Sequence, residues 1–284
     1  MSLAPALVSA GAALSCSTLL TSGYGRLTAL CEALDLVVAE PHSPAAPGWV
    51  DLAELTLHPE PLESFLAMTA TRMEERYAHT ARPDVVASRA LHGLLWSATL
   101  LISGPWYLER RVPRLRPDAV RVSRSGERYA VVPGGFWCLP DDPASALPGA
   151  SVLPGETALR DAVRAEAADL ARPLLAAFGP RLRRGPRALW GMVTDDLVSG
   201  IWYAGRMLGD EEDAVRAAEA LLPGAVGPYP GGARFRRLTG ADGTSHPTRT
   251  RLGCCLHYTV RPAEACATCP RTPDTERLRR LAEG

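Results

Sequence analysis

The chain has 284 residues, of which 46% are hydrophobic and 22% charged, and its formal net charge is zero. This composition is typical of a soluble globular protein with one large or two small domains, whose core folds without disulfides or metals. The balanced charge argues against a nucleic-acid binder, and the complete absence of lysine excludes Walker A loops, PLP Schiff bases and lysine nucleophiles.

Nothing in the sequence predicts a membrane span or a targeting segment. No stretch reaches the roughly 18 uninterrupted apolar residues that a span needs. Residues 1–20 are apolar but lack the positive charges of a signal peptide, and Ala13-Leu14-Ser15-Cys16 matches a lipoprotein cleavage site too faintly to be accepted. We expect a cytoplasmic protein, whose seven cysteines are thiols or metal ligands.

The first half of the chain is predicted to be mainly helical. Small apolar faces predict helix over residues 1–34, whereas the proline-rich residues 40–61 are predicted to form a loop. Residues 62–80 and the segment from Pro83 to about Ile102 again show helical spacing. The second of these helices has a wide apolar stripe, so we expect it to be central to the core.

The second half begins with a change of period. Over residues 119–133, valines alternate around Ser125-Gly126, which predicts a β-hairpin. Residues 140–154 and 223–253 are rich in glycine and proline and are predicted to be irregular. Amphipathic spacing predicts the remaining helices, which cover residues 156–178, 187–208, 210–222 and 275–282. The predicted fold class is therefore α+β, predominantly helical, with a small β-hairpin and a loop-rich C-terminal segment.

Four of the seven cysteines form the most informative motif. They are Cys254, Cys255, Cys266 and Cys269, in the pattern C-C-x10-C-x2-C. Thiolates are the preferred ligands of zinc and of iron–sulfur clusters. The two residues between Cys266 and Cys269 let both sulfurs turn toward one metal, and Pro270 stiffens the exit of this loop.

The adjacent pair Cys254-Cys255 bears on the choice of metal. Zinc ribbons use C-x2-4-C at both ends, whereas directly adjacent cysteines point apart and chelate a single ion awkwardly. An iron–sulfur cluster has metal positions that lie further apart, so it accommodates two adjacent cysteines more easily than a single ion does. The adjacent pair therefore favours an iron–sulfur cluster. A zinc site and a metal-free thiol cluster stay open as alternatives.

This pattern close to the C-terminus resembles that of the FhuF-type ferric-siderophore reductases. The stretch Leu256-His257-Tyr258 resembles the family's aromatic segment, with His257 where a second tyrosine is usual, and helices near 88–110 and 190–208 are compatible with its upstream domain. The resemblance implies a [2Fe–2S] cluster on Cys254, Cys255, Cys266 and Cys269, with no catalytic residue beyond it. It also implies a division into a helical siderophore-binding scaffold, residues 1–245, and a [2Fe–2S]-binding segment, residues 246–284.

The resemblance further implies one-electron reduction of a ferric siderophore, which releases Fe(II) in the cytoplasm. No dinucleotide fingerprint is present, so we expect an external electron donor: a ferredoxin, a flavodoxin or a reductase. Two other functions stay open, a zinc-stabilised siderophore-binding module without a redox role and a [2Fe–2S] electron carrier for another oxidoreductase.

Several other side chains are candidates for the substrate site or the surroundings of the metal. Arg249, Arg251, Arg261 and Arg271 flank the cysteines and could attract an anionic complex, although a solvated arginine surface is the preferred interpretation. His257 is expected beside the site and not as a ligand. Asp195-Asp196 is interpreted as helix-surface charge. Core packing is preferred over a ligand-binding role for two further groups: the cysteines Cys16, Cys31 and Cys138, and the aromatic residues Trp96, Trp106, Tyr107, Trp190, Trp202 and Tyr203.

Overall fold

The computed structural model describes residues 14–40, 46–261 and 265–282, and predicted features in residues 1–13 and 41–45 lie outside this description. Helices dominate the described chain, and the predicted class, predominantly helical α+β, is confirmed. The helices are α1 (Cys16–Leu30), α2 (Leu52–Leu57), α3 (Pro59–Tyr77), α4 (Pro83–Glu109), α5 (Glu156–Leu182), α6 (Pro186–Leu208), α7 (Glu211–Leu221) and α8 (Asp274–Ala282). Short 3-10 turns are η1 (Pro117–Ala119) and η2 (His257–Thr259).

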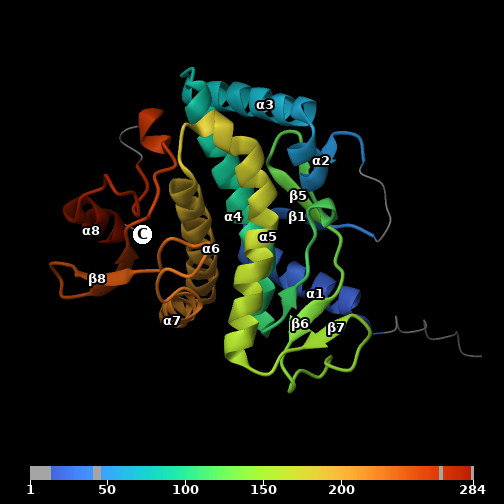
Figure 1. The fold of residues 1–284 in the computed structure, drawn as a ribbon. Helices are drawn as coiled ribbons and strands as arrows, with labels where there is room; N and C mark the ends of the chain where they lie inside the picture. Colours follow the sequence, from blue (N-terminus) through green and yellow to red (C-terminus); the bar gives the residue numbers. More distant parts are fainter. Residues whose placement is uncertain (1–13, 41–45, 262–264, 283–284) are drawn as a thin grey trace, which may run out of the picture.

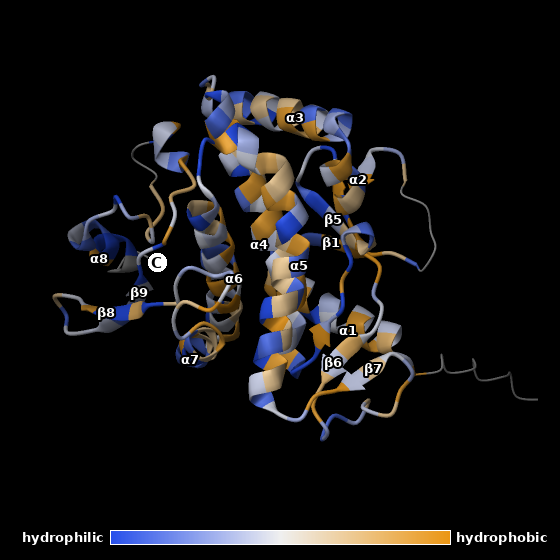
Figure 2. Cartoon of the chain, in the orientation of Figure 1, coloured by the Kyte–Doolittle hydropathy of each residue, from blue (hydrophilic) through white to orange (hydrophobic). Residues whose placement is uncertain are grey.

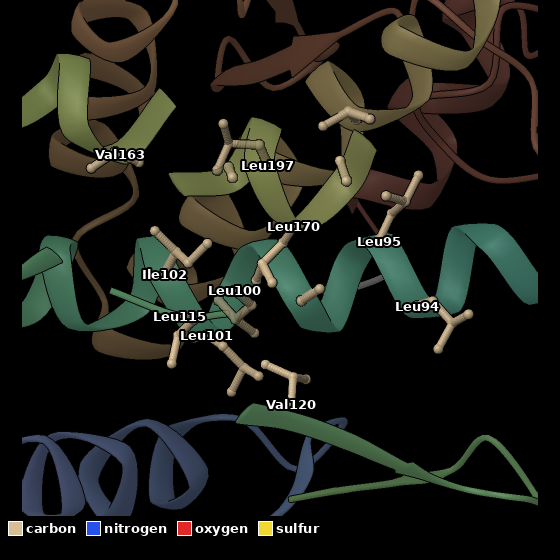
Figure 3. Close-up of a cluster of buried hydrophobic side chains, with 14 of the residues drawn as sticks. Leu94, Leu95, Leu100, Leu101, Ile102, Leu115, Val120, Val163, Leu170 and Leu197 are labelled. Carbon is tan, nitrogen blue, oxygen red and sulfur yellow. The ribbon is translucent and has the colours of Figure 1, made fainter. Parts of the chain in front are cut away.

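Helix α4 is the centre of the core, as its apolar stripe predicts. It begins with Pro83 in its first turn and runs about two turns past the predicted end at Ile102, through Pro105. Its composition and length would allow a membrane span, but 78% of its most apolar window is buried inside the protein, so it is a core helix. Figure 3 shows its leucines between α5 and α6 on one side and the strands on the other.

Short strands form three small sheets. The strands are β1 (Asp35–Val38), β2 (Trp49–Asp51), β3 (Val112–Pro113), β4 (Val120–Ser123), β5 (Arg128–Val131), β6 (Phe136–Cys138), β7 (Ala150–Val152), β8 (Phe235–Thr239) and β9 (Ser245–Arg249). The predicted hairpin is confirmed as β4–β5, within a four-stranded sheet of order β1-β5-β4-β2, and Gly126 takes a positive φ of 73° at its turn. A second sheet has the order β3-β6-β7.

Three segments predicted as loops contain regular structure. Residues 46–61 include β2 and α2 and the start of α3, and residues 140–154 include β7. Within 223–253, β8 and β9 pair in antiparallel register, with Leu238 opposite His246. These elements are short, and β9 contains Pro247, one of the prolines behind the prediction of irregular structure.

The C-terminal segment lies against α6, on the side away from the four-stranded and three-stranded sheets. Figure 1 shows α6 between α4 and the orange-to-red segment that carries β8 and α8. In Figure 2 this segment is mainly hydrophilic, with α8 strongly so, in contrast to the apolar faces of α4 and α6. Helix α6 therefore connects the apolar core to the cysteine-bearing segment.

Candidate metal centre

The four cysteines of the C-terminal motif come together in two close pairs. The Sγ atoms of Cys254 and Cys269 are 4.0 Å apart, and the side chains of Cys255 and Cys266 share a hydrogen bond. Cys255 and Cys269 are buried, while Cys254 and Cys266 are half-buried. The expected core positions of the other cysteines are confirmed, because all are buried elsewhere: Cys16, Cys31 and Cys138.

Tight turns hold the cysteines in place. Leu256 adopts a left-handed conformation, with φ of 64°, and its N–H donates to Cys254 Sγ at 3.4 Å. In the C-x2-C loop, the Cys269 N–H donates to the Cys266 carbonyl at 2.9 Å, and Thr268 Oγ1 lies 3.9 Å from Cys266 Sγ. Hydrogen bonds to ligand sulfurs are among the factors that set the potential of an iron–sulfur centre.

The thiols differ in how readily they ionise. The hydrogen bond from Cys266 lowers the pKa of Cys255, and the electrostatic effects of His92 and Arg89 act in the same direction. The same hydrogen bond, together with burial, raises the pKa of Cys266, and burial raises the pKa of Cys254. Both thiols of the Cys255–Cys266 pair would have to lose their protons to bind a metal.

The chain on the N-terminal side of the cysteines is fixed by Asp195 of α6. Its carboxylate accepts hydrogen bonds from Arg249 Nη2 at 2.7 Å and from the N–H groups of Leu252 and Gly253 at 2.9 and 2.8 Å. Burial raises the pKa of Asp195, and the charges of Arg249 and Arg251 oppose this shift. Asp195 therefore orients the backbone that leads directly into Cys254.

Asp196, the next residue, holds a second group of side chains. Its Oδ1 lies 2.7 Å from His92 Nδ1 of α4 and 2.6 Å from Arg251 Nη2. The guanidinium of Arg251 also lies within 3.4 Å of both ring nitrogens of His92. Through these contacts α4 and α6 position Arg251 close to the cysteines.

The sequence interpretation of these charges was wrong. Asp195 and Asp196 are fully buried and are not helix-surface charges, and Arg249 and Arg251, with 0% and 7% exposure, are not part of a solvated arginine surface. Residues 249–253 cover this face of α6, so the carboxylates of Asp195 and Asp196 are removed from solvent. Each buried charge has an opposite charge beside it.

The charge of Arg251 is also stabilised. Burial opposes it, but Asp196 and Asp195 raise the pKa of Arg251. The sulfurs of Cys255 and Cys266 add to this effect, which places the guanidinium within electrostatic reach of the site. A cluster on four thiolates is an anion, so a buried cation beside the sulfurs favours it.

Arg277 of α8 is a buried residue that sequence reasoning missed. Its guanidinium donates to the carbonyl oxygens of Arg249 at 2.5 Å, Cys269 at 2.8 Å and Thr272 at 3.0 Å. It therefore joins the strand before the first cysteine pair to the loop after the last cysteine. No sequence signal separates it from the neighbouring arginines of α8, because burial comes from the loop packed over it.

The remaining predicted residues lie around the edge of the site. The His257 ring contacts Tyr77 at 5.6 Å between centroids, and Arg261 lies over the same tyrosine. Arg271 lies over Tyr258, at 4.2 Å. Arg261 and Arg271 are exposed, so they match the surface position expected of them.

The tryptophans and tyrosines proposed as a possible ligand pocket belong to the core. Trp106 is part of the main apolar cluster, Trp202 is 9% exposed, and Trp96 contacts Tyr203 edge to face. The partly buried members of this group pack against the same core: Trp96, Tyr107, Trp190 and Tyr203. The core interpretation is therefore confirmed.

Comparison with known proteins adds the chemical identity of the site. Residues 251–271 match the model of the FhuF 2Fe–2S C-terminal domain. A search of curated proteins found no match to the chain. The FhuF match spans all four cysteines of the motif and confirms the predicted resemblance and the predicted cofactor, a [2Fe–2S] cluster. It indicates a siderophore-associated iron–sulfur protein.

The arrangement of the sulfurs fits this FhuF-type cofactor. Each iron of a [2Fe–2S] cluster takes two protein ligands, and the site offers one close pair of cysteines for each. Two pairs of thiols beside a buried guanidinium suit a two-iron centre better than a lone zinc ion.

Proposed function

We propose that this protein reduces ferric siderophore complexes by one electron, through a [2Fe–2S] cluster held by Cys254, Cys255, Cys266 and Cys269. The observation that carries the proposal is the FhuF 2Fe–2S match over residues whose sulfurs lie in two pairs. Cys254 and Cys269 would hold one iron and Cys255 and Cys266 the other, because these are the pairs of side chains that interact.

The chemistry follows from how siderophores hold iron. Their hard oxygen donors bind Fe(III) tightly, whereas Fe(II) is a larger and softer ion that binds them far more weakly. A single electron therefore turns a tightly bound ion into one that can leave. The electron comes from an external one-electron donor such as a ferredoxin, a flavodoxin or a reductase, and the freed siderophore oxygens take protons from water.

A bound [2Fe–2S] cluster supplies one-electron transfer, which matches this requirement. The side chains of the protein then have three tasks. Asp195 orders the backbone before Cys254, Arg277 fixes the loop after Cys269, and Arg251 balances negative charge at the sulfurs. None of them needs to act as a nucleophile or an acid.

The proposal also assigns separate roles to two regions of the chain. Residues 246–284 would form the [2Fe–2S]-binding segment, and residues 1–245 the scaffold that holds the siderophore. The buried position of α4 agrees with the cytoplasmic location that we propose. Localisation would be checked by separating the soluble and membrane fractions of cells that make the protein.

Metal analysis followed by a reduction assay tests the function. We expect iron and acid-labile sulfide in equal amounts, a red-brown colour that bleaches with dithionite, and Fe(II) captured by a trap when reduced protein meets ferric siderophores. Stoichiometric zinc in a colourless protein would support the binding module instead. A reduced protein that leaves every ferric siderophore untouched would be an electron carrier for another oxidoreductase.

A further inference from the structure

A cavity of about 250 Å³ lies between α3, α4 and the β4–β5 hairpin. Its wall includes Arg72, Arg76 and Tyr77 from α3, and Arg89 and Gly93 from α4. None of these positions belongs to the cysteine segment or to the residues that hold it. The cavity is therefore a separate feature of the upstream scaffold.

The cavity carries an excess of positive charge. Three guanidinium groups line it, from Arg72, Arg76 and Arg89, against one carboxylate, that of Glu127. Glu127 is 65% exposed and lies 3.7 Å from Arg72. Among the residues that the structure describes, Arg76 and Arg89 have no carboxylate within ion-pair distance. Two guanidinium groups thus remain available to an anion, and guanidinium suits oxygen-rich anions in particular.

Side chains on two helices connect this cavity to the cysteines. Ser88 Oγ donates to the carbonyl of Cys255 at 3.3 Å, and the next residue, Arg89, lines the cavity. On the other helix, Tyr77 forms part of the cavity wall and contacts the ring of His257. The wall of the cavity thus includes Tyr77, which contacts the cysteine segment directly, and Arg89, whose neighbour Ser88 does so.

We propose that this cavity binds an anionic Fe(III) chelate with oxygen donors, such as a tris-catecholate, and holds it beside the cluster. The inference rests on the proposed function and names its substrate site and the charge class of its substrate. Pockets that enclose a whole drug-sized ligand measure roughly 300–1,000 Å³, so this cavity takes one arm or face of the complex. The rest extends past the exposed Arg76 into solvent.

Gly93 offers a substitution that fills the cavity without disturbing the core. It is an exposed glycine within α4, and a Cβ atom added to it would meet nothing within 4 Å. Gly93→Glu adds bulk and negative charge at the cavity wall while improving helix propensity. Gly25→Glu is the matched control, because Gly25 is also an exposed helical glycine with open space around it, but lies on α1.

The arginines offer a second, milder test. Arg76→Gln and Arg89→Gln remove one charge each, and Arg172→Gln on the exposed face of α5 removes one charge away from the cavity. We expect a loss of affinity of roughly fivefold for each cavity arginine, the size of a partly exposed charge contact. The control should bind as the unaltered protein does.

Binding is measured by calorimetry with the gallium(III) complex of a tris-catecholate, which has the charge of the ferric complex but accepts no electron. The cluster-loaded protein should bind it, more weakly as salt is added, and Gly93→Glu should reduce the affinity roughly thirtyfold or more. Thermal unfolding and the visible spectrum should be unchanged, which shows that fold and cluster are intact.

The outcomes separate this inference from the function on which it rests. Absence of binding to the unaltered protein, or equal binding by Gly93→Glu and Gly25→Glu, overturns the cavity assignment, even if reduction of ferric siderophores is observed. Loss of binding in the cavity variants supports the assignment. If the unaltered protein binds the gallium complex but fails to reduce the ferric complex, the reductase proposal fails while the binding site stands.

Discussion

The scaffold and the cysteine segment are held in place by different forces. Residues up to β8 enclose one large apolar core around α4, to which α5 and α6 contribute leucines and valines. In residues 246–282, as far as the structure describes them, the buried groups are mainly arginines, threonines and cysteines, and the apolar exceptions are Pro247 and Val260. The stabilisation from apolar burial is spread over many side chains, so one substitution removes a small part of it. In a network of buried charges, the loss of one member leaves another charge buried without a partner, which is strongly destabilising. The two regions should therefore respond differently to substitution.

Loss of a cysteine should produce the largest contrast. Cys266→Ser is expected to abolish the cluster completely, while the far-UV circular dichroism of the helical scaffold persists, because the apolar core contains none of the four cysteines. Cys16→Ser, at a buried cysteine of α1, is the control and should retain the visible spectrum. Unfolding of the whole chain in Cys266→Ser would show that the two regions are not independent.

Asp195→Asn should have the next largest effect. It leaves the buried Arg249 without its partner charge, and breaking such a pair costs about 3–5 kcal/mol. We expect this free energy to be lost from the stability of the cysteine segment, so that amide exchange over residues 246–261 becomes faster and the iron content falls. Asp169→Asn, in an exposed ion pair with Arg172, should change stability by less than about 0.5 kcal/mol. Equal effects of the two changes would contradict the buried network.

Arg277→Met should have a smaller effect on the same region. The change removes donors to three backbone carbonyl groups and costs about 2–3 kcal/mol if those groups stay buried. Hydrogen exchange should report local opening of α8 and of the loop after Cys269. The control is Arg279→Met, where the side chain is 55% exposed. Unchanged exchange in Arg277→Met would show that the segment does not depend on this residue.

The smallest effect is expected at the edge of the site. Arg261 is exposed and lies over Tyr77, so Arg261→Gln should leave iron content and thermal stability unchanged and slow reduction of an anionic ferric complex by less than about threefold. Steady-state assays at low and high salt would measure this. A loss comparable to that of Gly93→Glu would move the substrate site away from the cavity and toward Arg261.

The contrast between the apolar scaffold and the charged cysteine segment also explains what could be predicted from the sequence. Helices α3, α4 and α6 follow from the spacing of their apolar residues, and the hairpin β4–β5 from valines around Gly126. The cysteine pattern predicted the cofactor. These features are local, so a short stretch of sequence carries the whole signal.

Other features depend on chain segments that meet only in the folded protein. Asp195 and Asp196 look like surface charges until residues 249–253 cover them, and Arg277 looks like its exposed neighbours. The hairpin β8–β9 forms despite Pro247. The basic cavity combines residues from α3, α4 and the β4–β5 hairpin. Its aromatic lining residues are Phe65, Tyr77 and Tyr129, and none of the tryptophans considered from the sequence lines it.

The most direct test of the central claim is a single-turnover experiment without oxygen. Protein reduced with dithionite and freed of excess reductant is mixed with a ferric siderophore and a chelator specific for Fe(II), while the cluster absorbance is followed. The account predicts that the oxidised spectrum returns as Fe(II) appears, in equal amounts and at the same rate. A cluster that stays reduced, or Fe(II) that forms as fast with Cys266→Ser, would contradict it.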